Sequence, residues 1–438
     1  MIPVFLGCET SEDLGIKYQL DSSASVKYVE FTLPATNIYV DSLRTDGENS
    51  VLAGNFTDNI TGTVSAEGYF QYSYERGPLP NVKVTKDEPN PQDTLKIDSL
   101  ILLLDTEAII PRASDTYQEF SIHELNDDLI NGAVYLSGLK QEMNATSIAN
   151  FSSAINSTTD NLFRLKFDDS YATAFYQNIS DINKDTLQFM VSATFKNLAV
   201  VPGALSESIA QFDLDSDSSR IIAYTSPVSP DSKDTTYVTT FKFSGKNYSY
   251  LDRSQSTYEN LGDKVEFNLA GGETLIDPLY GITTIHNIAE LATFFDANEN
   301  IIINNATISF AFESEASRDT LKSFYHFFNR ENGYFAPSIV INPFSNLVMS
   351  DQGYLNGQSN PALSALNSDK TTLNVNATLF FQTLYNNYDG ELKFSPSLNS
   401  EAFTLNEFAL MSSADVSLRR TIVGNDGIKL KIYYTQVD

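Results

Sequence analysis

Hydrophobic and polar residues alternate with a period of two along most of this chain, which is the pattern of β-strands that bury one face. Turn residues separate these runs, which recur at 162–167, 187–201, 220–225, 237–243, 301–312 and 373–384. The segment 97–104 ends in consecutive apolar residues and is typical of a strand buried on both faces. The pattern predicts an all-β protein with antiparallel sheets.

Near the C-terminus the alternation is split by a turn signal, Gly-Asn-Asp-Gly at 424–427. Asparagine and aspartate tolerate a positive φ, and glycine adopts one without steric strain. The sequence therefore predicts a β-hairpin with strands at 417–423 and 428–434. Lys429 and Lys431 are expected on its solvent-facing side.

Helical periodicity is sparse, and we expect only a few short helices. One is predicted over 284–295, where Leu291 and Phe295 share an apolar face. A second is predicted over 319–329, with Asp319 as its N-cap.

A chain of 438 residues is long enough for two or three domains, each with its own core. The segment 226–236 is polar and contains two prolines, which is typical of a linker or long loop. We therefore expect a signal remnant, lipobox and tether over 1–25, an N-terminal β domain over 26–225 and a C-terminal β domain over 226–438. Both domains are expected to be β-sandwiches or jelly-roll-like.

The charge balance narrows the classes of partner. The 28 basic and 56 acidic residues give a net charge of −28. Nucleic acid is therefore not expected as a partner, and direct adsorption to anionic lipid is disfavoured. No apolar run is long enough for a transmembrane helix. A single cysteine excludes an internal disulfide and a zinc–thiolate cluster within this chain.

That single cysteine, Cys8, follows Leu6 and Gly7 and resembles the lipobox of bacterial lipoproteins. We expect cleavage before Cys8 and attachment of lipid to its sulfur, so the membrane would be reached through the N-terminal lipid. Since none of the preceding residues is basic, the true start is expected to lie upstream. The alternative is a free cysteine buried near the terminus. The acidic residues Glu9, Glu12 and Asp13 resemble the signal that exports lipoproteins of the Bacteroidota to the outer face of the outer membrane.

Several segments together resemble one family of outer-membrane lipoproteins of the Bacteroidota, the domain-of-unknown-function family 4270. The resemblance is carried by the acidic start after Cys8 and by 40–45, 52–58, 62–71, 97–104, 195–198, 221–224 and 428–435. It covers nearly the whole chain after the cysteine. It implies a lipidated, β-rich protein exposed at the cell surface, and it carries no catalytic residue across.

The strongest metal candidate is the run that places Asp213, Asp215 and Asp217 at alternate positions. Calcium prefers six to eight oxygen ligands, and alternating aspartates in a loop supply several of them. Ser218 stands where an EF-hand loop needs glycine, and the glutamate at the end of such a loop is missing. Calcium is therefore weighed against a solvated turn between two strands, and no other cofactor is expected.

No catalytic motif is recognisable in the chain. The histidines, His123, His286 and His326, are far apart and form no zinc-protease pair. A serine-hydrolase elbow, a phosphate-binding loop and a dinucleotide-binding motif are also missing. We expect no enzymatic activity, although a carboxylate pair for glycoside hydrolysis would be assembled only in space.

Two tyrosine-rich segments, 69–75 and 248–250, are candidates for exposed surfaces on which sugars stack. The alternative is strand alternation that leaves these tyrosines half-buried, with the hydroxyl groups in water. The chain contains no tryptophan, which counts against a dedicated sugar-binding module.

We expect a non-catalytic, surface-exposed lipoprotein that acts as an accessory or scaffold subunit of an outer-membrane protein complex. The alternative is capture of a glycan or another nutrient. A scaffold predicts an exposed apolar patch, a glycan binder predicts a polar groove with amides and aromatic rings, and a hydrolase predicts two facing carboxylates.

Overall fold

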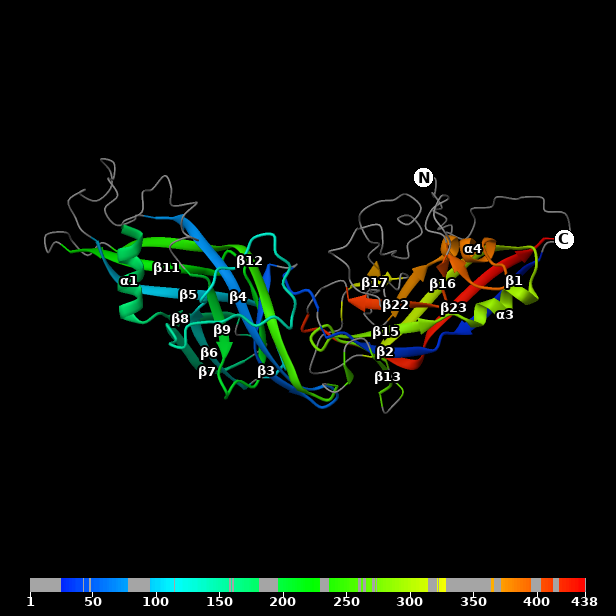
Figure 1. The fold of residues 1–438 in the computed structure, drawn as a ribbon, viewed down its shortest axis with the longest axis horizontal. Coiled ribbons are helices and arrows are strands. Elements are labelled where there is room, and N and C mark those ends of the chain that lie inside the picture. Colours follow the sequence, from blue (N-terminus) through cyan, green and yellow to red (C-terminus); the bar gives the residue numbers. More distant parts are fainter. Residues whose placement is uncertain are drawn as a thin grey trace, which may run out of the picture.

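Antiparallel strands dominate the protein, which confirms the predicted all-β class. In the computed structural model they form two lobes that lie side by side along the long axis (Figure 1). The structure describes residues 25–41, 43–46, 49–77, 95–113, 115–156, 159, 161–180, 196–228, 236–258, 261–262, 265–269, 272, 274–313, 321, 323–327, 364–365, 372–394, 403–412 and 417–437.

In the part of the chain that the structure describes, the first lobe is built from a single ten-stranded sheet and one helix. Its elements are β3 (Ser50–Asp58), β4 (Gly62–Arg76), β5 (Leu95–Ile110), β6 (Thr116–Glu124), β7 (Ala149–Ile155), β8 (Leu162–Lys166), α1 (Asp169–Ser180), β9 (Leu198–Pro202), β10 (Ile209–Asp213), β11 (Arg220–Pro227) and β12 (Tyr237–Ser256). The strands pair in the order β12-β11-β5-β10-β3-β4-β9-β6-β7, β8 joins β5, and β12 also pairs with β4. The sheet thereby closes on itself around one hydrophobic core.

Phenylalanine rings fill this core because alternate residues of every strand face inward. Phe120 lies 5.7 Å from Phe163 and 5.6 Å from Phe212, measured between ring centroids. The helix α1 covers one end of the core, where Phe175 lies 5.3 Å from Phe241. These edge-to-face contacts are the arrangement that aromatic pairs prefer.

The strands β4 and β12 form a long ribbon that joins the rest of the sheet in two places. At one end β12 pairs with β11, and at the other end β4 pairs with β3. β10 and β11 pair with different parts of the same strand, β5. The 214–219 connection between them leaves the sheet. The sheet is therefore interrupted between its two attachments to the ribbon.

The connection between β6 and β7 folds over β4 and β12 on the side away from the main core. Tyr135 of this connection stacks on Tyr248 of β12, with 4.4 Å between ring centroids. Tyr69 of β4 also contacts Tyr248 and is fully buried. The hydroxyl of Tyr69 donates a hydrogen bond to Glu67, which also accepts one from Lys140 of the connection, each at 2.7 Å.

Among its described residues, the second lobe holds two larger antiparallel sheets and two short helices. One sheet has the order β1 (Val26–Thr32), β23 (Thr421–Gln436), β16 (Ile301–Glu313), β19 (Thr372–Asn376), with β14 (Thr274–Ile276) beside β23. The other has the order β13 (Glu266–Phe267), β2 (Ala35–Tyr39), β15 (Ile282–Asn287), β22 (Glu407–Ser412), β17 (Ser323–Phe327), β18 (Ser364–Ala365). The remaining elements are α3 (Glu290–Ala297), α4 (Thr378–Asn386) and the short pair β20 (Lys393–Phe394) and β21 (Phe403–Thr404). His286 of one large sheet contacts Phe310 of the other, with 5.7 Å between ring centroids.

Strand pairing corrects the predicted division of the chain at 226–236. β12 lies beyond that segment, yet it pairs with β4 and β11 of the first lobe. β1 and β2 lie at the start of the chain, yet they pair with β23 and β15 of the second lobe. Hydrogen bonding and a shared apolar face decide strand partners, and proximity along the chain does not.

The two lobes share a buried junction of apolar and charged side chains. A hydrophobic cluster there combines Leu52 of the first lobe with Tyr39 and Leu279 of the second. Within it, Arg420 Nη1 lies 2.9 Å from Asp58 Oδ1, and both side chains are buried. The junction is therefore packed like a domain core and is not a loose linker.

Two local predictions near the C-terminus are wrong. The predicted hairpin around 424–427 is a single strand, β23, whose two halves both pair with β16. The pairing register shifts between Phe310 and Phe312 of β16, at the level of residues 424–427. β16 therefore pairs with β23 both before and after these residues, as at a β-bulge. The run 373–384, predicted as a strand, divides into β19 and α4. Phe380, Phe381 and Leu384 are buried on one face of α4, which accounts for the helix.

The two predicted helices have different outcomes. The segment 284–295 contains the start of α3, but its first residues belong to β15. The segment 319–329 contains β17, so the helix prediction is wrong there, and Asp319 lies outside the described residues. Among the described residues, no helix has the length and apolar character needed to cross a membrane.

Candidate functional site

A polar cavity with a volume of about 720 Å³ lies where the first lobe's sheet is interrupted. Residues 71–76 of β4 and 242–247 of β12 form one side of it. The 214–219 connection and Asn49, just before β3, form the other. Four separate segments of the sequence therefore line the cavity.

The 214–219 connection is held in place by its own side chains. Asp213 Oδ1 accepts hydrogen bonds from the backbone N–H groups of Asp215 at 2.9 Å and Ser216 at 3.1 Å. Ser216 Oγ donates to Asp105 Oδ2 at 2.5 Å, and the Asp105 N–H donates to Ser219 Oγ at 2.9 Å. Aspartate and serine commonly fix turns in this way, and here they tie the connection to β5.

The predicted calcium ligands do not converge on one point. Asp213 caps its own turn, and Asp215 Oδ2 accepts a hydrogen bond from Asn49 Nδ2 at 2.6 Å. Asp217 is exposed at the cavity. In the part of the chain that the structure describes, no group of three histidine, cysteine or acidic side chains is arranged to hold a metal ion. The run matches the alternative prediction, a turn between two strands.

The opposite wall is shaped by a bulge at 244–246 of β12. Gln71 Oε1 accepts a hydrogen bond from the Lys246 N–H, and Gln71 Nε2 donates to Leu129 O, both at 2.7 Å. Gly245 has a φ of +89°, and a Cβ there would lie 2.2 Å from Gln71 Oε1, so glycine is required. The bulge is thereby fixed at the edge of the cavity.

Lys246 turns away from the cavity and pairs with Asp46, which Arg44 also contacts. Burial alone would raise the pKa of the Asp46 carboxyl, but hydrogen bonds from Lys246 and Arg44 hold that pKa below its usual value. Both cations on this side are therefore paired with a carboxylate of the protein itself.

The cations that line the cavity are arranged differently. Arg220 of β11 lies directly opposite Lys242 of β12, and Arg76 follows at the end of β4. Within the described residues, these three side chains form no ion pair and no hydrogen bond. A bulge leaves Glu75 without an opposing residue, and both Glu75 and Arg76 are exposed at the cavity.

The tyrosine-rich segments do not provide the aromatic platform that a sugar-binding surface would need. Tyr69 and Tyr248 are fully buried, and Tyr72 is 4 % exposed. Phe243 lines the cavity but is itself buried. The predicted alternative, burial through strand alternation, agrees with these rings, but the prediction that their hydroxyl groups face water is wrong. The Tyr69 hydroxyl donates a hydrogen bond to Glu67, and the Tyr248 hydroxyl donates one to Leu139 O. Cys8, the predicted lipid attachment site, lies outside the described residues.

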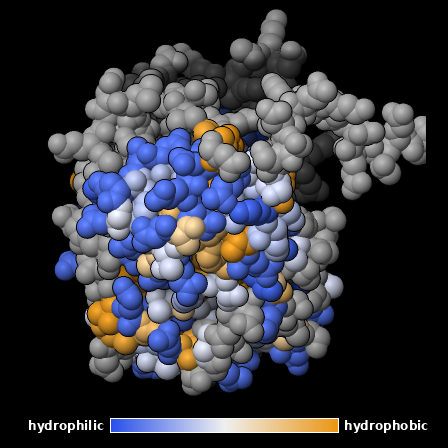
Figure 2. Space-filling model, turned by 90° about the vertical axis from the view of Figure 1, so that its right-hand side faces the viewer, coloured by the Kyte–Doolittle hydropathy of each residue, from blue (hydrophilic) through white to orange (hydrophobic). Residues whose placement is uncertain are grey.

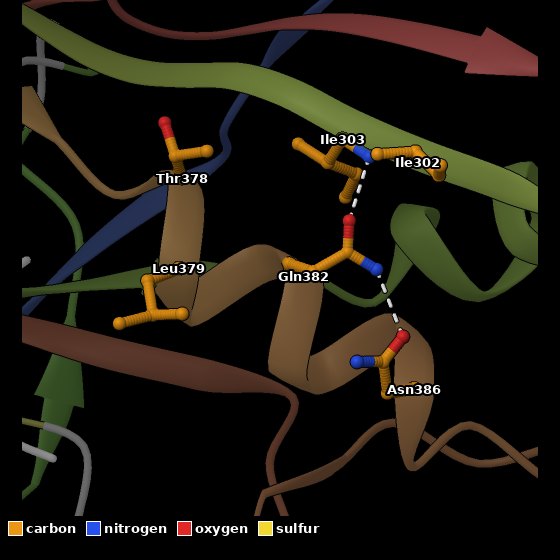
Figure 3. Close-up of a pocket in the computed structure, with 6 residues that line it drawn as sticks. All are labelled: Ile302, Ile303, Thr378, Leu379, Gln382 and Asn386. Atoms are coloured by element: carbon orange, nitrogen blue, oxygen red, sulfur yellow. Dashed lines mark hydrogen bonds between the residues drawn. The ribbon is translucent and has the colours of Figure 1, made fainter.

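A second hollow of about 460 Å³ lies between β16 and α4 of the second lobe (Figure 3). Gln382 Oε1 accepts a hydrogen bond from the Ile303 N–H at 2.7 Å, and Gln382 Nε2 donates to Asn386 Oδ1 at 2.8 Å. None of the described residues that line it is charged. The hydrogen bond from Ile303 covers an edge of β16 and has a structural role. The polar cavity of the first lobe is therefore the stronger candidate for a functional site.

The end of the second lobe shows small hydrophobic groups among hydrophilic residues (Figure 2). Its outer sheet carries Val26 and Ile302, 65 % and 52 % exposed, and the neighbouring rings of Tyr28 and Tyr433. Glu30 and Lys429 follow on the same strands, 3.0 Å apart. The apolar surface there is therefore bounded by charge.

Comparisons with protein-family models, curated proteins and solved structures gave no match. The resemblance to outer-membrane lipoproteins of the Bacteroidota stays a prediction from sequence motifs. A function must therefore be inferred from the chemistry of the cavity itself.

Proposed function

We propose that the protein is a non-catalytic binding protein that captures a polar solute, an oligosaccharide or a similar nutrient, in the cavity of its first lobe. The observation that carries the proposal is a cavity of about 720 Å³ whose walls are predominantly polar and are fixed by hydrogen bonds. Sites for small molecules are concave, largely preformed and few per protein. This volume falls within their usual range of roughly 300–1,000 Å³.

Preformed walls favour binding because little side-chain entropy is lost when the ligand arrives. On one side, hydrogen bonds to Asp105 hold the 214–219 connection. On the other, Gln71 holds the bulge of β12. Glu75 and Asp217 are exposed at the cavity and can accept hydrogen bonds from hydroxyl groups. The serine hydroxyls already serve structural contacts, since Ser219 donates to Asp213 O and Ser244 to Ser73 Oγ.

We place this capture at the cell surface, on the outer membrane, through lipid on Cys8. A lipid anchor suits a chain with a net charge of −28, which anionic membranes repel. Capture next to the membrane would raise the local concentration of a nutrient before uptake.

Calorimetric titration of the detergent-solubilised full chain with a panel of neutral and acidic oligosaccharides tests the proposal. We expect at least one of them to bind with a dissociation constant below about 1 mM. Ser244→Tyr should abolish this binding by filling the cavity. Ser226→Tyr is the matched control, since Ser226 lies on β11 away from the cavity. A panel without any binder, or equal loss in both variants, would rule the proposal out.

The accessory-subunit function remains a second candidate because of one exposed surface. The connection between β6 and β7 carries Ile130, Val134, Leu136 and Leu139, which are 67, 38, 40 and 46 % exposed. Exposed apolar residues gathered on one segment are typical of protein contacts. A pulldown from native outer membranes should then recover a β-barrel partner with the wild type and lose it with Ile130→Asp. Leu205→Asp, at an equally exposed position elsewhere in the lobe, is the control.

A further inference from the structure

We infer that the captured ligand carries an acidic group, a carboxylate or a sulfate on a saccharide, and that Arg220 and Lys242 bind this group. The inference rests on the proposed function, because it names the class of ligand for the same cavity. It is carried by three observations, namely the placement of the cations, their lack of partners and the acidic residues beside them.

The first observation is a pair of like charges placed directly opposite each other on neighbouring strands. Arg220 and Lys242 are register partners in the β11–β12 pairing. Side chains in this relation have Cβ atoms about 5 Å apart, and like charges there are destabilising. A local arrangement that works against folding is expected mainly at functional sites. An anion bound between the two side chains would turn their repulsion into attraction.

The second observation is that these cations lack partners in a strongly acidic protein. Elsewhere, Lys140 lies 2.7 Å from Glu67, and Lys429 lies 3.0 Å from Glu30. Arg220, Lys242 and the nearby Arg76 form no such pair among the described residues. Within this part of the chain they stay without an ion pair although the chain has 56 acidic residues and Glu75 and Asp217 line the same cavity.

The net charge of −28 does not exclude an acidic ligand. Exposed charges are screened beyond about 8 Å at physiological ionic strength, so distant carboxylates contribute little inside the cavity. Contacts at hydrogen-bond distance are screened far less, and hydrogen bonds from arginine or lysine to a carboxylate are strong.

The third observation limits how many acidic groups the ligand carries. Glu75 and Asp217 line the same cavity as Arg76 and Arg220. They would repel a second acidic group and accept hydrogen bonds from hydroxyls instead. The chemistry therefore fits a saccharide with a single acidic group better than a polyanion.

The test compares three probes on the full chain in detergent by calorimetric titration. The probes are a carboxylated saccharide (glucuronic acid linked to a neutral sugar), its neutral counterpart, and the corresponding sulfated sugar. We expect the better acidic probe to bind at least about tenfold more tightly than the neutral one, which corresponds to about 1.4 kcal/mol. Comparison of the two acidic probes distinguishes carboxylate from sulfate.

Substitution then identifies the cations responsible. The double variant Arg220→Gln and Lys242→Gln should lose the preference for the acidic probe while still binding the neutral one. Lys96→Gln removes a positive charge from the exposed start of β5 and should leave the preference unchanged. Raising the salt from about 0.1 M to about 1 M, which shortens the Debye length from about 10 Å to about 3 Å, should weaken only the acidic probe.

The possible failures are distinguishable. Equal affinity for the acidic and neutral probes would overturn this inference and leave the proposed capture function standing. A preference that survives in the double variant would also overturn it. No binding of any saccharide would overturn both the inference and the proposed function.

Discussion

At the scale of single residues, some positively charged side chains pair with carboxylates and stabilise the fold, whereas others have no such partner among the described residues. Lys246 and Arg44 hold Asp46, and their hydrogen bonds keep the pKa of that carboxyl low even though burial acts in the opposite direction. Arg220 and Lys242 face each other without such a partner among the described residues. Residues of the same charge therefore differ in their surroundings, since one pair is bound to a carboxylate and the other pair lines the cavity.

Arg220→Gln should stabilise the protein in the absence of ligand. Replacing one of two opposed cations removes a repulsion worth roughly 0.2–1 kcal/mol, and glutamine keeps a similar side-chain length. Urea unfolding should show a midpoint above that of the wild type with an unchanged slope. Lys96→Gln, whose ammonium group lies 3.9 Å from Asp98 at an exposed position, should not show this gain. A lower midpoint for Arg220→Gln would mean that the arginine supports the fold.

At the scale of elements, α4 protects an edge that β16 would otherwise expose. β19 pairs with β16 only from Thr307 onward, so within the described residues the earlier part of β16 has no strand on that side. Side chains of α4 accept hydrogen bonds from their backbone instead, as Figure 3 shows for Gln382. Thr378 Oγ1 accepts from the Ala306 N–H at 2.9 Å, and Tyr385 Oη from the Ile301 N–H at 3.1 Å. A helix that covers an edge removes a template for unwanted strand pairing.

Gln382→Leu should destabilise the protein by about 1–2 kcal/mol, because it leaves the part-buried Ile303 N–H without its acceptor. Amide hydrogen exchange should speed up at Ile303 and much less at Ile308, which lies within the paired part of β16. Gln382→Glu keeps an acceptor oxygen and is the matched control. Unchanged exchange at Ile303 in the leucine variant would show that α4 does not protect this edge.

The elements that could be predicted from the sequence are those whose strand pairing agrees with their local hydrophobic alternation. β8, β11 and β16 follow the alternation closely, because each strand has one face on a core. The predicted hairpin failed because β16 runs alongside the whole of β23, and that long-range partner overrides a local turn signal. In 373–384, strand alternation and a helical face overlap, so periodicity alone could not separate β19 from α4.

The cavity could be predicted only in part for a related reason. The Asp213, Asp215 and Asp217 run, predicted as a calcium site, lies at the connection that lines the cavity. Arg220 and Lys242 carry no signal in the sequence, because their opposition depends on the register of two strands. A local sequence pattern cannot contain that register.

At the scale of the whole molecule, the N-terminal strands explain why the lobes do not follow chain order. β1 and β2 come first in the sequence and pair with strands of the second lobe. The strands of the first lobe follow them in the sequence. The chain therefore crosses the junction on its way into the first lobe and again on its way out. Since Leu52, Tyr39 and Leu279 share one buried cluster there, we expect the lobes to unfold together in one transition.

The charges buried at the junction predict how this coupling depends on pH. Burial alone would raise the pKa of Asp58, but Arg420 and the N–H groups of Ile60 and Thr61 hold it below its usual value. A lowered pKa contributes stability that is present above the unfolded-state pKa and is lost as the pH falls through the folded-state value. The wild type should therefore lose junction stability in acid, at pH values below about 4.

Asp58→Asn tests this because asparagine keeps the oxygen that accepts from Ile60 and Thr61 but removes the charge facing Arg420. We expect a loss of roughly 2–3 kcal/mol near pH 7, at or below the usual range for breaking a buried pair, because Asp277 still lies 3.8 Å from Arg420. The loss should shrink as the pH falls below about 4, the usual pKa of an unfolded aspartate. Asp389→Asn, at an exposed pair with Lys393, should change the unfolding transition far less. Scanning calorimetry would show splitting of the single transition if the pair couples the lobes, whereas a pH-independent difference would contradict the assigned role of Asp58.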